Sequence, residues 1–157
     1  MKIFLWPAFI FVVLAPYSVH AEVGAEGDGH HKSKNHFSII SGSSVVPDHD
    51  LDAVTFGFDF ERELTPHLGL GIVAEHAFGE LDATSIFAVA DVHVGRGLVL
   101  QLGPGVEFID GKSLAVGRVG VFQELHLGEF VVAPSVSYDF TKEENTLVLG
   151  VALGTRF

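Results

Sequence analysis

The sequence predicts an all-β protein: an eight-stranded antiparallel up-and-down transmembrane β-barrel, preceded by a cleaved signal peptide. Three observations predict this fold. From His36 to the C-terminus, apolar residues alternate with small or polar ones in segment after segment, which is the period of a β-strand. Tight turns alternate with somewhat longer acidic connections between these segments. The mature chain has no run of about 18 apolar residues that would form a transmembrane helix.

Residues 1–21 have the composition of a secretory signal peptide. Lys2 gives a short basic start, residues 3–15 are mostly apolar, and residues 19–21 (Val-His-Ala) form a small-x-small cleavage site. A retained membrane anchor fits less well, because the apolar stretch is short and is interrupted by proline. We therefore expect cleavage near Ala21 and export of the mature chain.

Residues 22–35 are polar and rich in glycine, which predicts a flexible leader ahead of a barrel at residues 36–157. His30, His31 and His36 are weak candidates for a metal site, since imidazole is a common ligand of divalent metals. Adjacent histidines on a glycine-rich segment have no fixed geometry, so a solvated leader is the favoured interpretation. The same holds for the acidic and histidine residues at 48–50.

The charge and cysteine content exclude several classes of function. Loss of Lys2 with the signal peptide leaves eight Lys and Arg against twenty Asp and Glu, a formal charge of −12. Such an acidic chain lacks the basic footprint of a nucleic-acid-binding protein or of one that binds anionic membrane surfaces through basic patches. With no cysteine, the chain has neither a disulfide framework nor a lipid-anchored cysteine.

The alternation divides the barrel region into eight expected strands. The last strand is the clearest, because Leu149, Val151, Leu153 and Phe157 fall on one face and small residues fall on the other. The first strand has the least clear alternation. The expected ranges are 36–43, 53–63, 67–78, 84–94, 98–109, 114–125, 130–140 and 145–157.

The connections alternate in length. Tight turns are expected at 64–66, 95–97 and 126–128, and longer acidic connections at 44–52, 79–83 and 141–144. Asp110-Gly111 departs from this alternation, because Asp-Gly is a strong signal for a two-residue hairpin. Short turns at one end and longer loops at the other are typical of transmembrane barrels.

A period of two residues does not by itself show which face points outward. A soluble lipocalin-like barrel that binds an apolar ligand inside is the main alternative, and its outer face would be rich in charge. Here the less apolar face is mainly Gly, Ala, Ser and Val, which suits the narrow interior of a small barrel. The apolar face is therefore expected to face lipid.

With these strands, the signal peptide and the closing Leu153-Gly154-Thr155-Arg156-Phe157, the chain resembles the small OmpA/OmpX-type outer-membrane barrels of Gram-negative bacteria. The resemblance implies a place in the cell outer membrane, contact with membrane lipid and lipopolysaccharide, and a monomer. It also implies that Phe157 is part of the signal read by the barrel-assembly machinery. The chain differs in its aromatic residues, since Phe replaces most of the interfacial Tyr and Trp.

On this architecture the lumen holds many more acids than bases. Side chains of eight-stranded barrels normally fill the interior, so paired charges that plug the barrel are the favoured interpretation. The excess acid leaves carboxylates to be protonated, exposed at the rims or bound to a cation. The expected interior charge network contains Asp59, Glu75, Asp91, His93, Glu107, Arg118, Asp139 and Arg156, with Gln101 beside it and Glu61 and Glu124 at the inner rim.

The sequence thus favours a non-enzymatic outer-membrane barrel with a side-chain-filled interior, short acidic outer loops, no cofactor, and a role in envelope structure or surface interaction. A soluble periplasmic or secreted barrel is the second hypothesis. The third is a lipid-modifying enzyme. Known lipid A deacylases carry a lipid-facing His-x-Ser pair on a late strand, whereas the His-x-Ser here, His36 and Ser38, is on the first strand.

Overall fold

The computed structural model describes residues 34–47 and 51–157, and nearly all of them lie in strands. The expected signal peptide and nearly all of the leader, including His30 and His31, lie outside the described residues. The strands are β1 (Asn35–Val46), β2 (Leu51–Thr65), β3 (Leu68–Gly79), β4 (Ala83–Gly95), β5 (Leu98–Ile109), β6 (Lys112–Gln123), β7 (Leu125–Leu127), β8 (Phe130–Phe140) and β9 (Asn145–Arg156).

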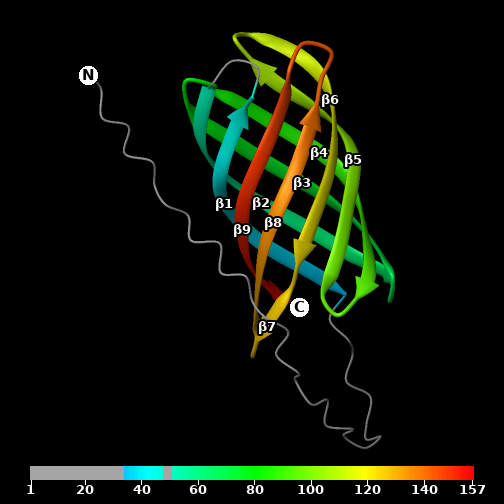
Figure 1. The fold of residues 1–157 in the computed structure, drawn as a ribbon. Coiled ribbons are helices and arrows are strands. Elements are labelled where there is room, and N and C mark those ends of the chain that lie inside the picture. The colour runs from blue at the N-terminus through cyan, green and yellow to red at the C-terminus, as the bar shows by residue number, and fades with distance from the viewer. Residues whose placement is uncertain (1–33, 48–50) are drawn as a thin grey trace, which may run out of the picture. The chain divides into compact units, whose positions relative to one another are not determined.

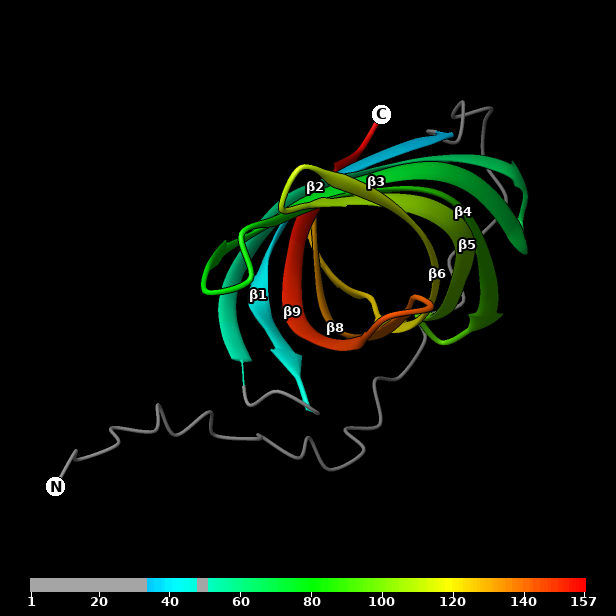
Figure 2. The same ribbon diagram turned by 90° about the horizontal axis from the view of Figure 1, so that it is seen from above.

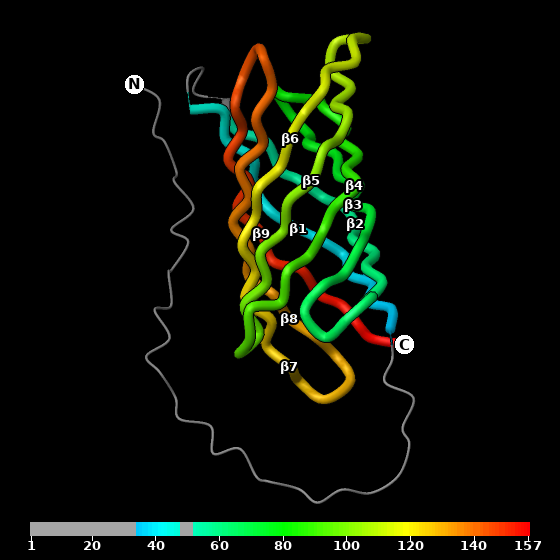
Figure 3. Tube along the Cα trace, turned by 90° about the vertical axis from the view of Figure 1, so that its right-hand side faces the viewer, coloured from blue at the N-terminus to red at the C-terminus, as the bar shows by residue number. Residues whose placement is uncertain are grey.

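The strands form one closed antiparallel barrel in up-and-down order (Figures 1 and 2). Apart from β6 and β7, each strand pairs with the next along the chain, and β1 pairs with β9 from His36–Arg156 to Val45–Leu147, which closes the ring. β6 and β7 pair with successive parts of β8, so they are two pieces of one barrel strand. The barrel therefore has eight strands, as the sequence predicts. Figure 3 shows the same strands from the side, steeply tilted.

Local sequence accounts for the tightest hairpins. Asp110 and Gly111 both have positive φ, 50° and 73°, as a two-residue hairpin turn requires. Arg96 and Gly97 repeat this geometry at the other end of the barrel, with φ of 54° and 77°. Glycine adopts this backbone without strain, and it follows a non-glycine residue in both turns.

The observed boundaries mostly lie within two residues of the expected ones and differ most at two places. β1 continues to Val46 and β2 begins at Leu51, so the first outer connection is much shorter than the expected 44–52. The sixth barrel strand breaks at Glu124, whose backbone N–H donates to the Gly97 carbonyl of the neighbouring turn. The outer connections are therefore only slightly longer than the inner turns, and the barrel carries little beyond its wall.

The apolar face of every long strand points outward. Phe56 and Ile72 in the barrel wall are 50% and 53% exposed, and Leu153 on the closing strand is 54% exposed. Aromatic rings pack on this outer surface, with Phe37 against Phe58. None of the described residues forms a helix long and apolar enough to cross a membrane. An outer surface this apolar is typical of contact with lipid rather than water.

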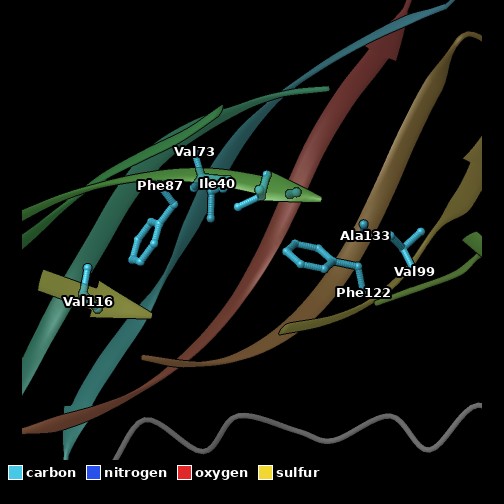
Figure 4. Close-up of a cluster of buried hydrophobic side chains, with 9 residues drawn as sticks. Ile40, Val73, Phe87, Val99, Val116, Phe122 and Ala133 are labelled. Carbon is cyan, nitrogen blue, oxygen red and sulfur yellow. The ribbon is translucent and has the colours of Figure 1, made fainter. Parts of the chain in front are cut away.

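The interior combines apolar packing with buried charge. One cluster of inward-facing apolar side chains includes Phe87, in the middle of β4, and Phe122, near the inner end of β6 (Figure 4). A second cluster lies toward the outer end and includes Leu81 of the β3–β4 connection. Its other members are Val46, Ala53, Ala77 and Ala83, with Ile109 packed against them.

Candidate functional site

The lumen is the candidate site, because the buried charged side chains meet there. Strands alternate their side chains between lipid and lumen, so each polar inward position adds to one internal column. Side-chain contacts group these residues into four levels between the inner end, where the short turns lie, and the outer end. From the inner end these are a rim with Glu61, a pair of aspartates that share Gln101, a cluster around Arg118, and Glu107 with Ser85.

Arg118 is the centre of the arginine cluster and is 2% exposed. Its Nη1 and Nη2 donate to Glu75 Oε1 and Oε2 at 2.8 and 2.5 Å. Its Nε and Nη2 donate to Asp139 Oδ1 and Oδ2, both at 2.7 Å. The guanidinium also lies 4.0 Å from the centre of the Phe87 ring. Two bidentate carboxylates and a cation–π contact fix this side chain across the lumen.

Glycines on the barrel wall make room for these acids. A Cβ at Gly57 would lie 2.6 Å from Glu75 Cγ, and a Cβ at Gly69 would overlap the Glu61 carboxylate. Contacts under about 3 Å force a side chain to move. Gly57 and Gly69 therefore serve the charge network directly, because each leaves the volume that a neighbouring glutamate side chain occupies.

A second cluster contains Asp59, Asp91 and Gln101. The Gln101 Nε2 donates to Asp59 Oδ2 at 3.2 Å and to Asp91 Oδ1 at 2.9 Å. Gln101 and Asp91 are only 1% and 3% exposed. Asp59 Oδ1, Asp91 Oδ2 and Gln101 Oε1 are buried, and none has a hydrogen-bond partner among the described residues. This level holds two carboxylates and one neutral donor group.

The inner rim carries a third network. His93 Nε2 lies 2.7 Å from Glu61 Oε1, and Arg156 Nη2 donates to both Glu124 oxygens at 3.0 and 2.8 Å. His36 Nδ1 lies 3.9 Å from both Glu61 Oε2 and Glu124 Oε1, between the two pairs. The rim therefore links β1, β2, β4 and β9 through charged side chains around the mouth of the lumen.

The outer level is less charged. Ser85 Oγ donates to Glu107 Oε2 at 3.2 Å, and the Ser44 and Thr55 hydroxyls lie 2.5 Å apart. A small polar hollow lies here, beneath the apolar cluster that contains Leu81. Hydroxyl groups thus take over from ion pairs toward the outer end of the lumen.

The structure places every residue of the expected charge network in the lumen or at its inner rim. It brings Arg118 to Glu75 and Asp139, but it leaves Asp59 and Asp91 without a cation among the described residues. Reasoning from the sequence missed the rim position of His36 between two glutamates. The inward alternation of β1 is the signal that places His36 there.

No group of three or more His, Cys, Asp or Glu side chains that could hold a metal ion occurs among residues 34–47 and 51–157. The candidate ligand His36 instead contacts glutamates of the rim. Its Nε2 also lies 3.4 Å from Ser38 Oγ, so the His-x-Ser pair does meet. Ser38 is buried in the lumen, on the face away from lipid.

A polar group also lies on the outer surface. On the outer surface of β3 and β4, His76 Nδ1 lies 2.8 Å from Thr84 Oγ1, and His76 Nε2 lies 3.5 Å from Asp82 Oδ1. Asp82 is almost fully exposed at the outer end. Polar side chains at this level suit the boundary between membrane and water.

The chain is similar to the N-terminal β-barrel domain of Pseudomonas aeruginosa OprF, with a TM-score of 0.65 and 16% identity over 80% of this chain and 100% of that one. It is similar to Ail, the attachment invasion locus protein of Yersinia pestis, with a TM-score of 0.56 and 17% identity over 80% and 99% of the two chains. This chain has the fold of a small eight-stranded outer-membrane β-barrel.

Neisserial surface protein A shares this barrel fold, with a TM-score of 0.55 and 9% identity over 78% of this chain and 96% of that one. No protein-family model matches the chain, and no curated protein matches its sequence. The likeness therefore concerns the barrel fold. It agrees with the apolar outer surface and charged lumen, which contradict the alternative of a soluble barrel with an apolar interior.

Proposed function

We propose that this chain is a non-conducting, non-enzymatic barrel of the cell outer membrane with a structural role in the envelope. After cleavage near Ala21, the barrel spans the membrane with its apolar wall in contact with lipid and lipopolysaccharide. It acts as a monomer. The acidic mature chain does not favour nucleic acid as a partner.

The observation that carries the proposal is the blocked lumen. Arg118 ties β3, β6 and β8 together across the interior, and Phe87 packs on the guanidinium. The cluster with Leu81 lies farther out, and the cluster that contains Phe87 and Phe122 extends toward the inner end. Water and ions have no wide path through such packing, so the barrel serves as a membrane-embedded body rather than a pore.

The outside of the barrel supports a structural rather than an adhesive role. The outer connections are short, and the exposed acids at Glu80, Asp82, Asp110 and Glu143 outnumber the basic Lys112 and Lys142. Short acidic connections offer little area for a protein interface, which typically needs about 800 Å² per partner. They suit contacts with cations that bridge lipopolysaccharide.

Conductance across planar lipid bilayers tests the blocked lumen. We expect no stable conductance steps from the parent chain. A variant with Glu75, Arg118 and Asp139 all changed to Ala removes only the ion cluster, so it should give at most small steps, because the two apolar clusters still fill the lumen. Stable steps from the parent would contradict the proposal.

Cells lacking the chain test the structural role. We expect them to leak periplasmic protein and to become sensitive to detergent, and expression of the parent should restore both. A barrel with the lumen-facing substitution Ser38→Ala should restore them equally, because the proposed role needs no catalytic pair. Failure of that variant, with normal amounts in the membrane, would point to chemistry at His36 and Ser38.

A further inference from the structure

The charge balance of the lumen is uneven between its levels. Arg118 pairs with two carboxylates, and at the inner rim Arg156 pairs with Glu124 while His93 meets Glu61. Asp59 and Asp91 lie between these levels, and no cationic side chain among the described residues forms an ion pair with either. A buried carboxylate without a cation or several donors is costly, so this level is where the lumen most needs a positive charge.

The buried oxygens at this level lack donors. Gln101 offers one amide NH₂ group, which both carboxylates share. Asp59 Oδ1, Asp91 Oδ2 and Gln101 Oε1 remain buried without a partner among the described residues. Two carboxylates and one amide, each with a buried oxygen that has no partner among the described residues, therefore meet at this level of the lumen. Hard divalent cations take this donor set of carboxylate and amide oxygens.

We propose that Asp59, Asp91 and Gln101 form a binding site for one calcium ion inside the barrel. Two carboxylates match the charge of a divalent ion, and water completes the six to eight oxygen ligands that Ca²⁺ takes. Mg²⁺ fits less well, because it demands near-ideal octahedral geometry and these ligands come from three separate strands, β2, β4 and β5.

The Gln101 amide gives the site two arrangements. In the structure its NH₂ group holds the carboxylates by hydrogen bonds of 3.2 and 2.9 Å. Rotation of the amide by half a turn exchanges Nε2 and Oε1 in nearly the same shape. Oε1 then lies near the present Nε2 position, and oxygens that share one Ca²⁺ lie about 3 Å apart. Calcium binding thus replaces two hydrogen bonds with oxygen coordination.

The inner mouth of the lumen lies next to the site. Glu61 and His93 lie two residues from Asp59 and Asp91 on the same strands, so they occupy the next inward positions toward the mouth. A hollow at the mouth is lined by His36, Glu61, Glu63, His93 and Arg156, together with Lys34 and Asn35. Glutamates at the mouth attract cations toward the lumen.

Calcium titration of the mature chain, refolded in nonionic detergent and freed of metal with EGTA, tests the site. Isothermal titration calorimetry should show one Ca²⁺ per barrel. Calcium at about 100 times its dissociation constant should raise the temperature at which the folded gel band is lost by roughly 5–10 °C. Mg²⁺ and Na⁺ at equal concentration should give smaller shifts.

Three variants locate the ion. Asp59→Asn and Asp91→Asn each remove one charged ligand and should weaken binding at least about tenfold, and Gln101→Met should weaken it without changing the charge. Asp110→Asn, at the exposed outer turn, is the matched control and should bind calcium as the parent does. Gln101→Met keeps the test decisive if an Asn variant fails to fold.

Several results would overturn the site. One is a parent that neither binds calcium nor melts at a higher temperature with it. Another is a set of lumen variants that bind calcium like the Asp110→Asn control. A third is stabilisation by lower pH with no effect of calcium, which would mean that the two carboxylates take protons instead of a metal ion.

Discussion

Arg118 on β6 donates two hydrogen bonds to Glu75 on β3, although β5 and β4 lie between these strands in the sheet. The wall of a barrel holds only neighbouring strands together. A bidentate pair across the lumen therefore adds a tie that backbone hydrogen bonds do not provide. Asp139 on β8 accepts from the same guanidinium and extends the tie to a third strand.

Loss of this tie should be costly. Arg118→Ala leaves two buried carboxylates facing each other, so we expect the free energy of unfolding to fall by roughly 2–5 kcal/mol. Urea unfolding in lipid vesicles measures this change. Lys142→Ala, at an exposed outer turn, is the control and should change stability by less than about 0.5 kcal/mol.

A neutral replacement of the whole cluster separates stranded charge from lost packing. With Glu75→Gln, Arg118→Met and Asp139→Asn combined, no buried charge remains unpaired. We expect this triple variant to be more stable than Arg118→Ala alone, because much of the single-variant cost comes from the stranded carboxylates. Equal destabilisation of the two would show that shape, rather than charge, is what Arg118 supplies.

At the level of Asp59 and Asp91, removal of a charge should raise the free energy of unfolding rather than lower it. Asp91→Asn removes one of two buried carboxylates that share a single donor group, and the new amide can donate to Asp59. In the presence of EGTA we expect the free energy of unfolding to rise by about 1–3 kcal/mol. Asp110→Asn, which changes the same charge at an exposed turn, should leave it nearly unchanged. A fall on Asp91→Asn would mean that Asp91 is already well compensated.

The outer surface predicts a cost that depends on depth in the membrane. Ile72 lies in the middle of β3 and is exposed on the apolar surface. Ile72→Arg should cost about 2–4 kcal/mol and Leu64→Arg, near the inner end, about 0–1 kcal/mol, when unfolding is measured in lipid vesicles. Equal small costs at both sites would argue that water, not lipid, meets this surface.

Phe157 should matter for assembly more than for stability. Its backbone exchanges hydrogen bonds of 2.9 and 3.1 Å with Asn35, and its ring is exposed. Phe157→Ala keeps the backbone bonds, so we expect unaided refolding in detergent to be unchanged. The amount of folded barrel in the outer membrane of cells should fall, as detected by heat-dependent gel mobility. Thr155→Ala is a control in the same strand.

How far the sequence predicts this molecule depends on the kind of contact. Alternation predicts which residues face the lumen, so Asp59, Arg118 and Asp139 are found on the inward face without any structural information. It does not predict which inward residues meet, because Glu75 reaches Arg118 across the lumen from a strand that is not its neighbour. Whether the Glu75 and Arg118 side chains meet depends on the tilt and stagger of all the strands in the barrel.

Local irregularities are also hidden from a period of two residues. Turn chemistry identifies Asp110-Gly111, whereas the break at Glu124 depends on a hydrogen bond to the separate turn at Gly97. The first outer connection is misjudged because Ser44 and its neighbours lack the apolar alternation of the other strands. Their pairing with β2 and β9 extends the strand all the same.

The glycines of the inner wall give the last prediction. A Cβ at Gly57 would overlap the Ala74 carbonyl oxygen and lie 2.6 Å from Glu75 Cγ, so Gly57→Ala must shift the β3 backbone, the Glu75 side chain or both. We expect a loss of about 1–3 kcal/mol in the free energy of unfolding, which is the usual cost of overpacking. Gly150→Ala is the matched control, since its Cβ would meet nothing nearer than 3.2 Å.

The coupling between Gly57 and the ion cluster can be measured by combining substitutions. If Gly57→Ala acts by displacing Glu75, it should cost much less in a background where Glu75 is already Ala, because the smaller side chain leaves room for the added methyl group. The two changes would then be strongly non-additive in urea unfolding. If the losses of stability from the two substitutions simply add, the strain lies in the backbone contact between Gly57 and Ala74 instead. The packing of the barrel wall would then be independent of the charge network in the lumen.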